Sequence, residues 1–135
     1  MTRGIRNNNP LNIRYVERNR WRGRVLIKKD KSFEEFISMD YGFLAAFKLL
    51  KRYIEQKHLT TPTEIISTWA PSNENNTAKY VQDVCRMTGI GGRENITAHD
   101  PRLKDLVWAM AIIESGHEIE QYRNALDKAW SNYNG

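Results

Sequence analysis

Apolar side chains recur at helical spacing along most of the chain after residue 40. From Phe43 to Ile54 they return every three or four residues, which predicts a helix over about 41–56 with Asp40 as its N-cap. Thr61-Pro62-Thr63-Glu64 combines a capping box with proline at the first helical position. A second helix is therefore expected to begin at Pro62 and to stop before Pro71.

Three further helices are predicted from the same signals. A polar SNENN loop precedes a helical pattern that ends at Gly89, and Asp100-Pro101 repeats the order of a cap followed by proline before a pattern that Gly116 closes. The last pattern is amphipathic and lies near the end of the chain. The predicted helices span about 77–88, 101–115 and 118–131, with a Gly-rich connection over 89–99.

The chain before residue 40 has a different character. RNNNPLNIR is too rich in Asn and Pro for a regular element and predicts a loop, because Asn side chains bond to nearby backbone. Segments 20–28 and 32–38 indicate a short β-hairpin. With no repeat or linker, we expect one mostly helical α+β domain over residues 1–135.

The composition excludes several classes of protein. Hydrophobic residues make up 40% of the 135 and charged residues 27%, which is typical of a globular domain with a real core. Mean hydropathy is −0.68, so no membrane span is expected. The first residues lack the apolar stretch of a signal peptide. Cys85 is the one cysteine and the three histidines are scattered, so we expect no metal and no cofactor.

The net charge is +5, and the basic residues gather near the start of the chain. Such a patch suits a polyanionic partner such as nucleic acid, teichoic acid or an anionic envelope, or it is a solvated surface. Nucleic acid is not the expected partner, because interleaved surface aromatics and a helix-turn-helix signature are not expected here. The basic residues concerned are Arg14, Arg18, Arg20, Arg22, Arg24, Lys28, Lys29 and Lys31.

One glutamate lies on the apolar face of its predicted helix. At about 100° per residue, Glu114 falls in the stripe that Leu103 and Met110 define. A charged group there is costly unless it is paired or neutral, and a neutral carboxylic acid can protonate a glycosidic oxygen. The alternative is that Glu114 pairs with an arginine or reaches solvent at the helix end.

The residues around this glutamate resemble a known catalytic helix. AMAIIESGHE is similar to the helix of goose-type lysozymes and lytic transglycosylases in which a glutamate followed by serine ends an apolar stretch. ENNTAKYVQDV resembles the transglycosylase segment whose tyrosine faces that glutamate. The resemblance implies that Glu114 is the catalytic acid and that Ser115 and Tyr80 orient its carboxylate or an attacking group. For Tyr80 the alternative is a packed core tyrosine.

A wider resemblance covers nearly the whole chain. RNNNPLNIRY is similar to the Asn-rich loop of phage and flagellar glucosaminidases, which follows their catalytic helix. R-G-x-R-N-N-N-P-x-N-I-R, W-A-P-x-x-E-N-N-T and E-x-G, at 3–14, 69–77 and 114–116, resemble phage proteins that include virion structural proteins. Because the loop here precedes the helix, we infer a circularly permuted lysozyme-like domain in which Glu114 faces Asn8 and Asn9.

The same resemblance implies a set of substrate-binding residues, each with a structural alternative. The asparagines and Arg14 would line the cleft or stiffen the loop, and Trp69 would stack on a sugar or belong to the core. Glu74 would be a second carboxylate or would cap the helix near Thr77. The full predicted set is Asn8, Asn9, Asn12, Arg14, Trp69, Glu74 and Asn75.

The implied function is cleavage of peptidoglycan glycan strands by a muramidase or a lytic transglycosylase. An inverting muramidase needs a second carboxylate about 6.5–9.5 Å from the first, whereas a transglycosylase can use one acid and a hydroxyl of the substrate. The alternative is a non-catalytic virion structural or peptidoglycan-binding protein. Expected partners are glycan strands and other virion proteins, with the protein in the virion, or in the host cytoplasm before release to the wall.

Overall fold

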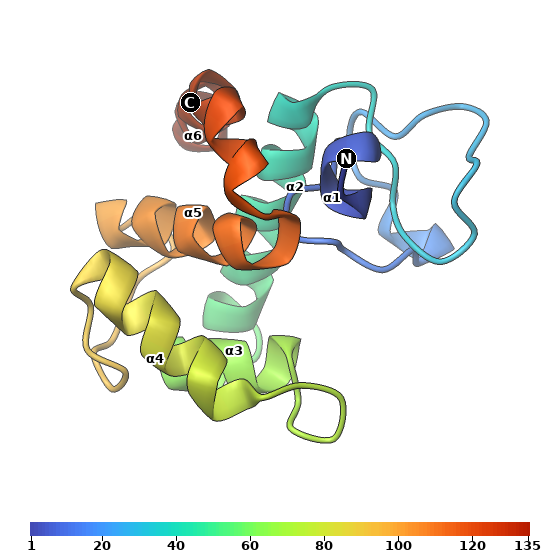
Figure 1. Cartoon of the computed structure of the whole chain (residues 1–135). Coiled ribbons are helices and arrows are strands. Elements are labelled where there is room, and N and C mark those ends of the chain that lie inside the picture. The colour runs from blue at the N-terminus through green and yellow to red at the C-terminus, as the bar shows by residue number, and fades with distance from the viewer. The chain divides into compact units, whose positions relative to one another are not determined.

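Six α-helices provide nearly all of the regular structure of the chain (Figure 1). The computed structural model describes all residues, 1–135. Two short 3-10 helices, Glu17–Asn19 and His117–Tyr122, accompany the α-helices. The α-helices are α1 (Arg3–Arg6), α2 (Met39–Glu55), α3 (Pro62–Trp69), α4 (Thr77–Thr88), α5 (Pro101–Ser115) and α6 (Arg123–Asn134).

Contacts divide the chain into two units, and both chain ends belong to the same one. The terminal unit comprises Met1–Lys48 and Met110–Gly135, and the middle unit comprises Leu49–Ala109. The boundaries fall inside α2 and α5. The prediction of one domain over 1–135 stays a prediction.

Local signals predicted the helix limits of the middle unit well. The capping box at α3 is confirmed, because the Thr61 hydroxyl accepts from the Glu64 amide at 3.2 Å and the Glu64 carboxylate accepts from the Thr61 amide. Helix α4 covers the predicted residues and ends at Gly89, whose φ of 75° is left-handed. At the start of α5, the Asp100 carboxylate accepts from the Arg102 amide at 2.9 Å, as a cap should.

Two helix limits in the terminal unit were predicted wrongly. Asp40 does not cap α2, because the helix begins one residue earlier and the Ser38 hydroxyl donates to the Asp40 carboxylate. The predicted helix over 118–131 is a 3-10 turn followed by α6. Gly116, which lies between α5 and this 3-10 turn, has a left-handed φ of 83°.

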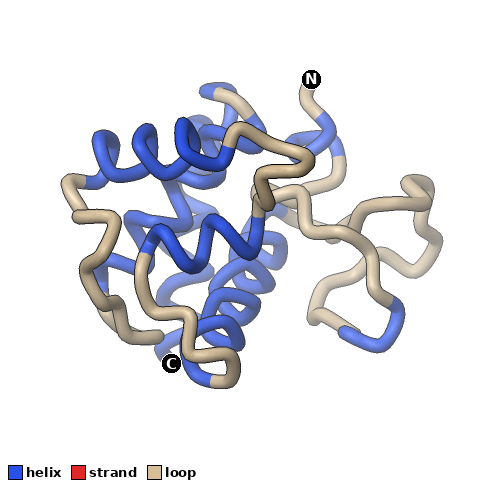
Figure 2. The backbone as a smooth tube through the Cα atoms, turned by 90° about the horizontal axis from the view of Figure 1, so that it is seen from below, coloured by secondary structure: helices blue, strands red, loops and turns tan.

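The predicted β-hairpin is wrong, and the fold is helical rather than α+β. Figure 2 shows loop where segments 20–28 and 32–38 were expected to pair. Only isolated antiparallel bridges form, between Arg14 and Phe33 and between Arg24 and Phe36. The chain turns through left-handed residues at Arg20 (φ 45°) and Gly23 (φ 80°), which interrupts a regular ladder.

A buried ion pair holds this long loop in place of a ladder. Glu34 is completely buried, and its two carboxylate oxygens accept from the Arg24 Nε at 2.9 Å and from its Nη2 at 2.7 Å. Arg24 also donates to the main-chain carbonyls of Val16 and Glu17. Bidentate pairing of this kind satisfies a carboxylate that burial would otherwise penalise.

Helix α6 packs on the first half of α2 through aromatic rings. Phe47 is fully buried, and its ring centroid lies 5.1 Å from that of Trp130 in an edge-to-face arrangement. The Tyr133 ring stacks on Phe47 at 5.4 Å. These contacts join the C-terminal helix to the segment that follows the long loop.

In the middle unit, α3 and α4 pack together and the Gly-rich connection returns to the start of α3. The Thr63 amide donates to the Gly92 carbonyl at 3.1 Å, and the Ile96 amide donates to the Thr60 carbonyl at 2.8 Å. A Cβ at Gly92 would lie 2.9 Å from the Thr63 hydroxyl oxygen, so glycine lets the two segments pack without moving that side chain.

Candidate functional site

The C-terminal end of α5 is joined to the start of the chain by three side-chain hydrogen bonds, two with the Asn-rich loop and one with the residue that caps α1. Asn12 Nδ2 donates to the Glu114 carbonyl at 3.1 Å, and Ser115 Oγ donates to the Pro10 carbonyl at 2.8 Å. Thr2 Oγ1 donates to the Ser115 carbonyl at 2.8 Å. The partners in these bonds are separated by between 102 and 113 positions in the sequence. Two of the bonds satisfy carbonyls at the helix end that have no helical partner.

A glycine permits the close packing at this junction. A Cβ at Gly4 would lie well inside van der Waals contact of Ser115 Oγ and 2.9 Å from the carbonyl oxygen of Asn9. Helix α1 can therefore approach the end of α5 only with glycine at this position. Gly4 belongs to the R-G-x-R part of the first motif. The reason for glycine at this position of the motif is steric.

The asparagine side chains of the loop bond chiefly to backbone. Asn9 is fully buried, donates to the carbonyls of Ile13 and Glu34 at 3.0 Å each, and accepts from the Ile13 amide at 2.9 Å. Asn8 has a φ of 53° and donates to the Phe36 carbonyl at 3.0 Å. These contacts favour the loop-stiffening role for Asn8 and Asn9, because the buried amide of Asn9 does not reach solvent.

Asn7 connects the loop to an ionised aspartate. Its Nδ2 donates to Asp30 at 3.0 Å, and the main-chain amides of Ser32 and Phe33 donate to the other Asp30 oxygen. The hydrogen bond from Asn7 and those from the backbone lower the pKa of Asp30 from 3.8 to about 2, with a smaller contribution from Arg3. Asp30 is thus a structural anion that shapes the long loop.

The lowered pKa of Asp30 predicts acid sensitivity of the loop. A carboxyl whose folded pKa is lowered adds stability that is complete above its unfolded pKa of 3.8 and is lost as the pH falls through about 2. We expect Asp30→Asn to be less stable than wild type at pH 5, with the gap closing toward pH 2. Urea unfolding across that range measures the gap, and a gap that stays constant would contradict the assignment.

Glu114 lies near the end of α5 and is half-buried. The apolar residues of the predicted stripe are fully enclosed, among them Leu103 and Met110, whereas Glu114 keeps part of its surface in solvent. The prediction of a glutamate on the buried face is thus met only in part. The partial exposure leaves a route by which a ligand could reach the side chain.

Ser115 is fully buried, and its hydroxyl contacts the loop. Because it donates to the Pro10 carbonyl, it holds the helix end against the loop in this structure. We expect Ser115→Ala to leave that carbonyl without its donor and to lower the free energy of unfolding by about 1–3 kcal/mol. Thermal unfolding measures the loss. Ser131→Ala, at an exposed position on α6, should change stability little, and equal effects would contradict the special role of Ser115.

The two remaining predicted residues of the loop differ in their environment. Arg14 is exposed, and its guanidinium carbon lies 5.0 Å from the centre of the Phe33 ring. Asn12 has a φ of 53°, and its Oδ1 is enclosed without a hydrogen-bond partner. Asn12 therefore places one satisfied and one unsatisfied amide atom beside the end of α5.

The other predicted site residues belong to the middle unit. Tyr80 is buried within α4, and Trp69 is half-buried at the end of α3. Glu74 and Asn75 are exposed in the loop between these helices. Glu74 does not cap α4, because Asn76 is the N-cap and accepts from the Lys79 amide at 3.1 Å. The Tyr80 alternative of a packed residue agrees with its burial.

The structure therefore gathers part of the predicted set in one unit. Glu114, Ser115, Asn8, Asn9, Asn12 and Arg14 all lie in the terminal unit, and Tyr80, Trp69, Glu74 and Asn75 lie in the middle unit. Sequence reasoning missed Thr2, Gly4 and the Pro10 carbonyl. Gly4 and Pro10 both fall inside the first motif, but the use of the Pro10 carbonyl as an acceptor leaves no signal in the sequence.

The structure contains neither a metal-binding cluster nor a helix suited to cross a membrane. No group of three or more His, Cys, Asp or Glu side chains is placed so that it could hold a metal ion. None of the helices has both the length and the apolar character needed to cross a bilayer.

Comparison with known proteins gives one relationship of high coverage. No protein-family model matches the chain. Over 122 residues the chain is 34% identical to Protein P5 of Pseudoalteromonas phage PM2, and the match covers 89% of this chain and 75% of that protein. Identity at this level over most of both chains indicates a shared fold and a common family.

Proposed function

We propose, from the premise that the chain belongs to the family of Protein P5 of Pseudoalteromonas phage PM2, that it cleaves the glycan strands of peptidoglycan. The name of that relative states no activity. The proposal therefore depends on the residues at the end of α5 and on their resemblance to lysozyme-like enzymes. Glu114 is the proposed general acid.

The observation that carries the proposal is the hydrogen bonding between the end of α5 and the Asn-rich loop. In the enzymes that the sequence resembles, this loop follows the catalytic helix in the chain, and here it precedes it. Asn12 and Ser115 nevertheless join the two segments through the Glu114 and Pro10 carbonyls. This contact supports a circularly permuted lysozyme-like arrangement, because chain order differs while the neighbouring segments are the same.

The proposed chemistry uses Glu114 to protonate the glycosidic oxygen between two sugars. Asn12 and Ser115 are positioning residues, since they hold the helix end that carries the acid. Arg14 is exposed in the same unit and is a candidate for contact with the strand. Asn8 and Asn9 act by stiffening the loop, and the roles of Tyr80, Trp69, Glu74 and Asn75 stay predictions from the sequence.

We favour a lytic transglycosylase, because it needs only the one acid that the proposal assigns, and Glu74 stays the predicted second carboxylate of an inverting muramidase. Glu34 is a carboxylate of the loop in the same unit, but it is completely buried and paired with Arg24, so it cannot activate water at a substrate. A transglycosylase needs no water-activating base, because a hydroxyl of the substrate attacks the anomeric carbon as the glycosidic bond breaks. Its proton passes to the Glu114 carboxylate, which has just given its own proton to the leaving oxygen. Glycan strands would be the partner, met from the virion or after release from the host cytoplasm.

The test is a digest of purified peptidoglycan with the wild-type protein, followed by chromatography and mass spectrometry of the products. We expect anhydromuramic acid ends, which are one water lighter than the reducing ends of hydrolysis. Reducing ends would identify a muramidase instead. Binding to intact sacculi without any shortening of strands would support the alternative of a non-catalytic virion protein and would contradict the proposal.

A further inference from the structure

Two neighbouring aliphatic side chains of the terminal unit stand fully in solvent. Leu26 has a relative exposure of 102% and Ile27 of 84%, although most large apolar residues of the chain are buried. They lie in the long loop between α1 and α2, which leaves α1 and returns to the start of α2 (Figure 1, light blue). An adjacent pair of exposed aliphatic residues is a common feature of surfaces that enter an apolar partner.

The loop around this pair is held by hydrogen bonds. The Val25 amide donates to the Glu35 carbonyl at 3.1 Å, and the Lys29 and Asp30 amides donate to the Glu35 carboxylate. The Lys28 ammonium donates to the Phe33 carbonyl. Because the backbone on both sides is bonded, the structure presents the two aliphatic side chains outward.

Positive charge surrounds the exposed pair. Residues 14–38 contain eight Lys and Arg and four Asp and Glu. Two of the four acids are bonded within the loop. Glu34 pairs with Arg24, and Glu35 accepts hydrogen bonds from main-chain amides. A third, Asp30, bonds to Asn7. The carboxylates are thus largely engaged inside the unit, and the basic side chains dominate the outer surface.

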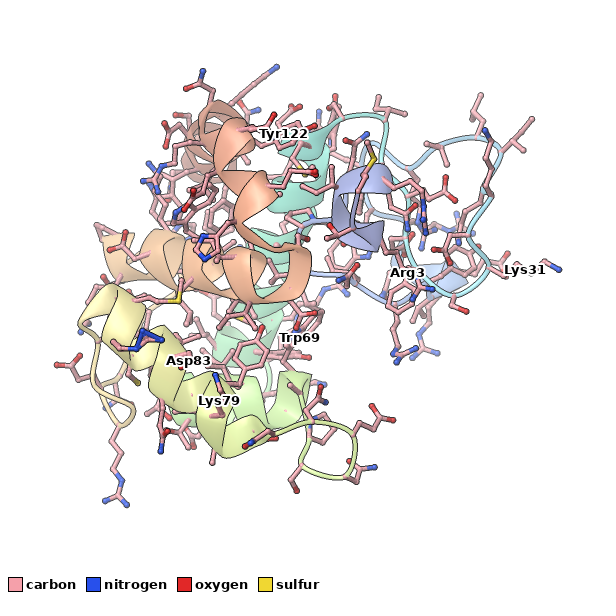
Figure 3. The ribbon with its side chains drawn as sticks, viewed as in Figure 1. Arg3, Lys31, Trp69, Lys79, Asp83 and Tyr122 are labelled. Atoms are coloured by element: carbon pink, nitrogen blue, oxygen red, sulfur yellow. The ribbon has the colours of Figure 1, made fainter.

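A groove beside Ile27 gathers several of these cations. It has a volume of about 720 Å³, and its lining includes Lys29 and Lys31 of the loop, Arg3 and Arg6 of α1, and the carboxylates of Asp30 and Glu35, which bond within the unit. Figure 3 labels Arg3 on α1 and Lys31 on the loop, the two segments that contribute these cations. Arg3 Nε lies 3.5 Å from Asp30, so this arginine is already in part neutralised. The groove is large enough for an anionic head group.

We propose that this surface binds an anionic lipid bilayer. Leu26 and Ile27 enter the boundary between head groups and acyl chains, and Arg6, Lys29 and Lys31 contact lipid phosphates. The combination of aliphatic side chains with cations is what an interfacial anchor requires. A nucleic acid would use the cations but has no place for the aliphatic pair. This inference does not depend on the proposed function.

The test is flotation of the purified full-length protein with vesicles of phosphatidylglycerol and phosphatidylcholine, compared with phosphatidylcholine alone. We expect wild type to float with the anionic vesicles and to be released by salt in part. The double variant Leu26→Ser/Ile27→Ser should bind about tenfold more weakly or worse, because two apolar insertions are lost. Both positions are exposed, so the fold should be unchanged, and circular dichroism checks it.

Controls distinguish insertion from simple charge attraction. Met87→Ser removes an exposed apolar residue of the middle unit and should leave binding unchanged. Lys29→Gln/Lys31→Gln should weaken binding and reduce its dependence on salt. Leu26→Trp should show a blue shift of the added fluorescence on anionic vesicles. Equal binding of wild type and the serine variant, or no binding of wild type to anionic vesicles, would overturn the proposal.

Discussion

Replacing Glu114 with glutamine is expected to slow glycan cleavage by about 10²–10⁴-fold, the usual contribution of a general acid. Glutamine has nearly the same shape but cannot donate the proton that the leaving oxygen needs. The main-chain carbonyl of residue 114 would still accept from Asn12, so the helix end should keep its contact with the loop. The measurement is the initial rate of turbidity loss of purified peptidoglycan, with thermal unfolding to confirm an intact fold.

Glu118→Gln is the matched control for this substitution. Glu118 lies four residues further along, is half-buried like Glu114, and belongs to the 3-10 helix rather than to the end of α5. It should digest peptidoglycan at the wild-type rate. Equal rates for wild type and Glu114→Gln would remove this glutamate from the mechanism, and loss of activity in both variants would indicate a nonspecific effect of charge.

The helix limits that could be predicted were those set by local chemistry. The capping box at Thr61 and the left-handed Gly89 act on backbone groups within a few residues, so the sequence contains all that decides them. The hairpin could not be predicted in this way. Both segments contain aromatic and β-branched residues, but Arg24 and Glu34 form a buried pair across the loop and only isolated bridges result. That outcome depends on a contact between distant groups.

The candidate site shows the same limit. The resemblance pointed to Glu114 and to the Asn-rich loop, and these segments do meet through Asn12. The number of asparagines did not reveal how their amides are used. Asn9 is enclosed and bonds to the main chain at Ile13 and Glu34, which requires the folded positions of all three residues. Polar residue types identify a functional loop more readily than they identify which members contact a ligand.

The second large effect is expected at Gly42 in the first turns of α2. Within a helix, alanine is normally more favourable than glycine by about 0.8–1.0 kcal/mol. Here a Cβ would overlap the main-chain carbonyl oxygen of Asn8 and would lie 2.7 Å from Pro10 Cδ. Neither group can swing aside as a flexible side chain would, since both belong to the loop that is bonded to the end of α5.

The overlap should therefore outweigh the helical preference, and Gly42→Ala should lower the free energy of unfolding by about 3 kcal/mol or more. For a protein of this size that corresponds to a fall in melting temperature of roughly 10 °C, which calorimetry would detect.

Gly91→Ala is the control, because its Cβ would meet only the Glu94 side chain at 3.3 Å, and that side chain can move. Since the displaced loop contacts the end of α5, Gly42→Ala should also reduce glycan cleavage at temperatures where it remains folded. A stabilised Gly42→Ala protein would show that the loop does not pack against α2 as described.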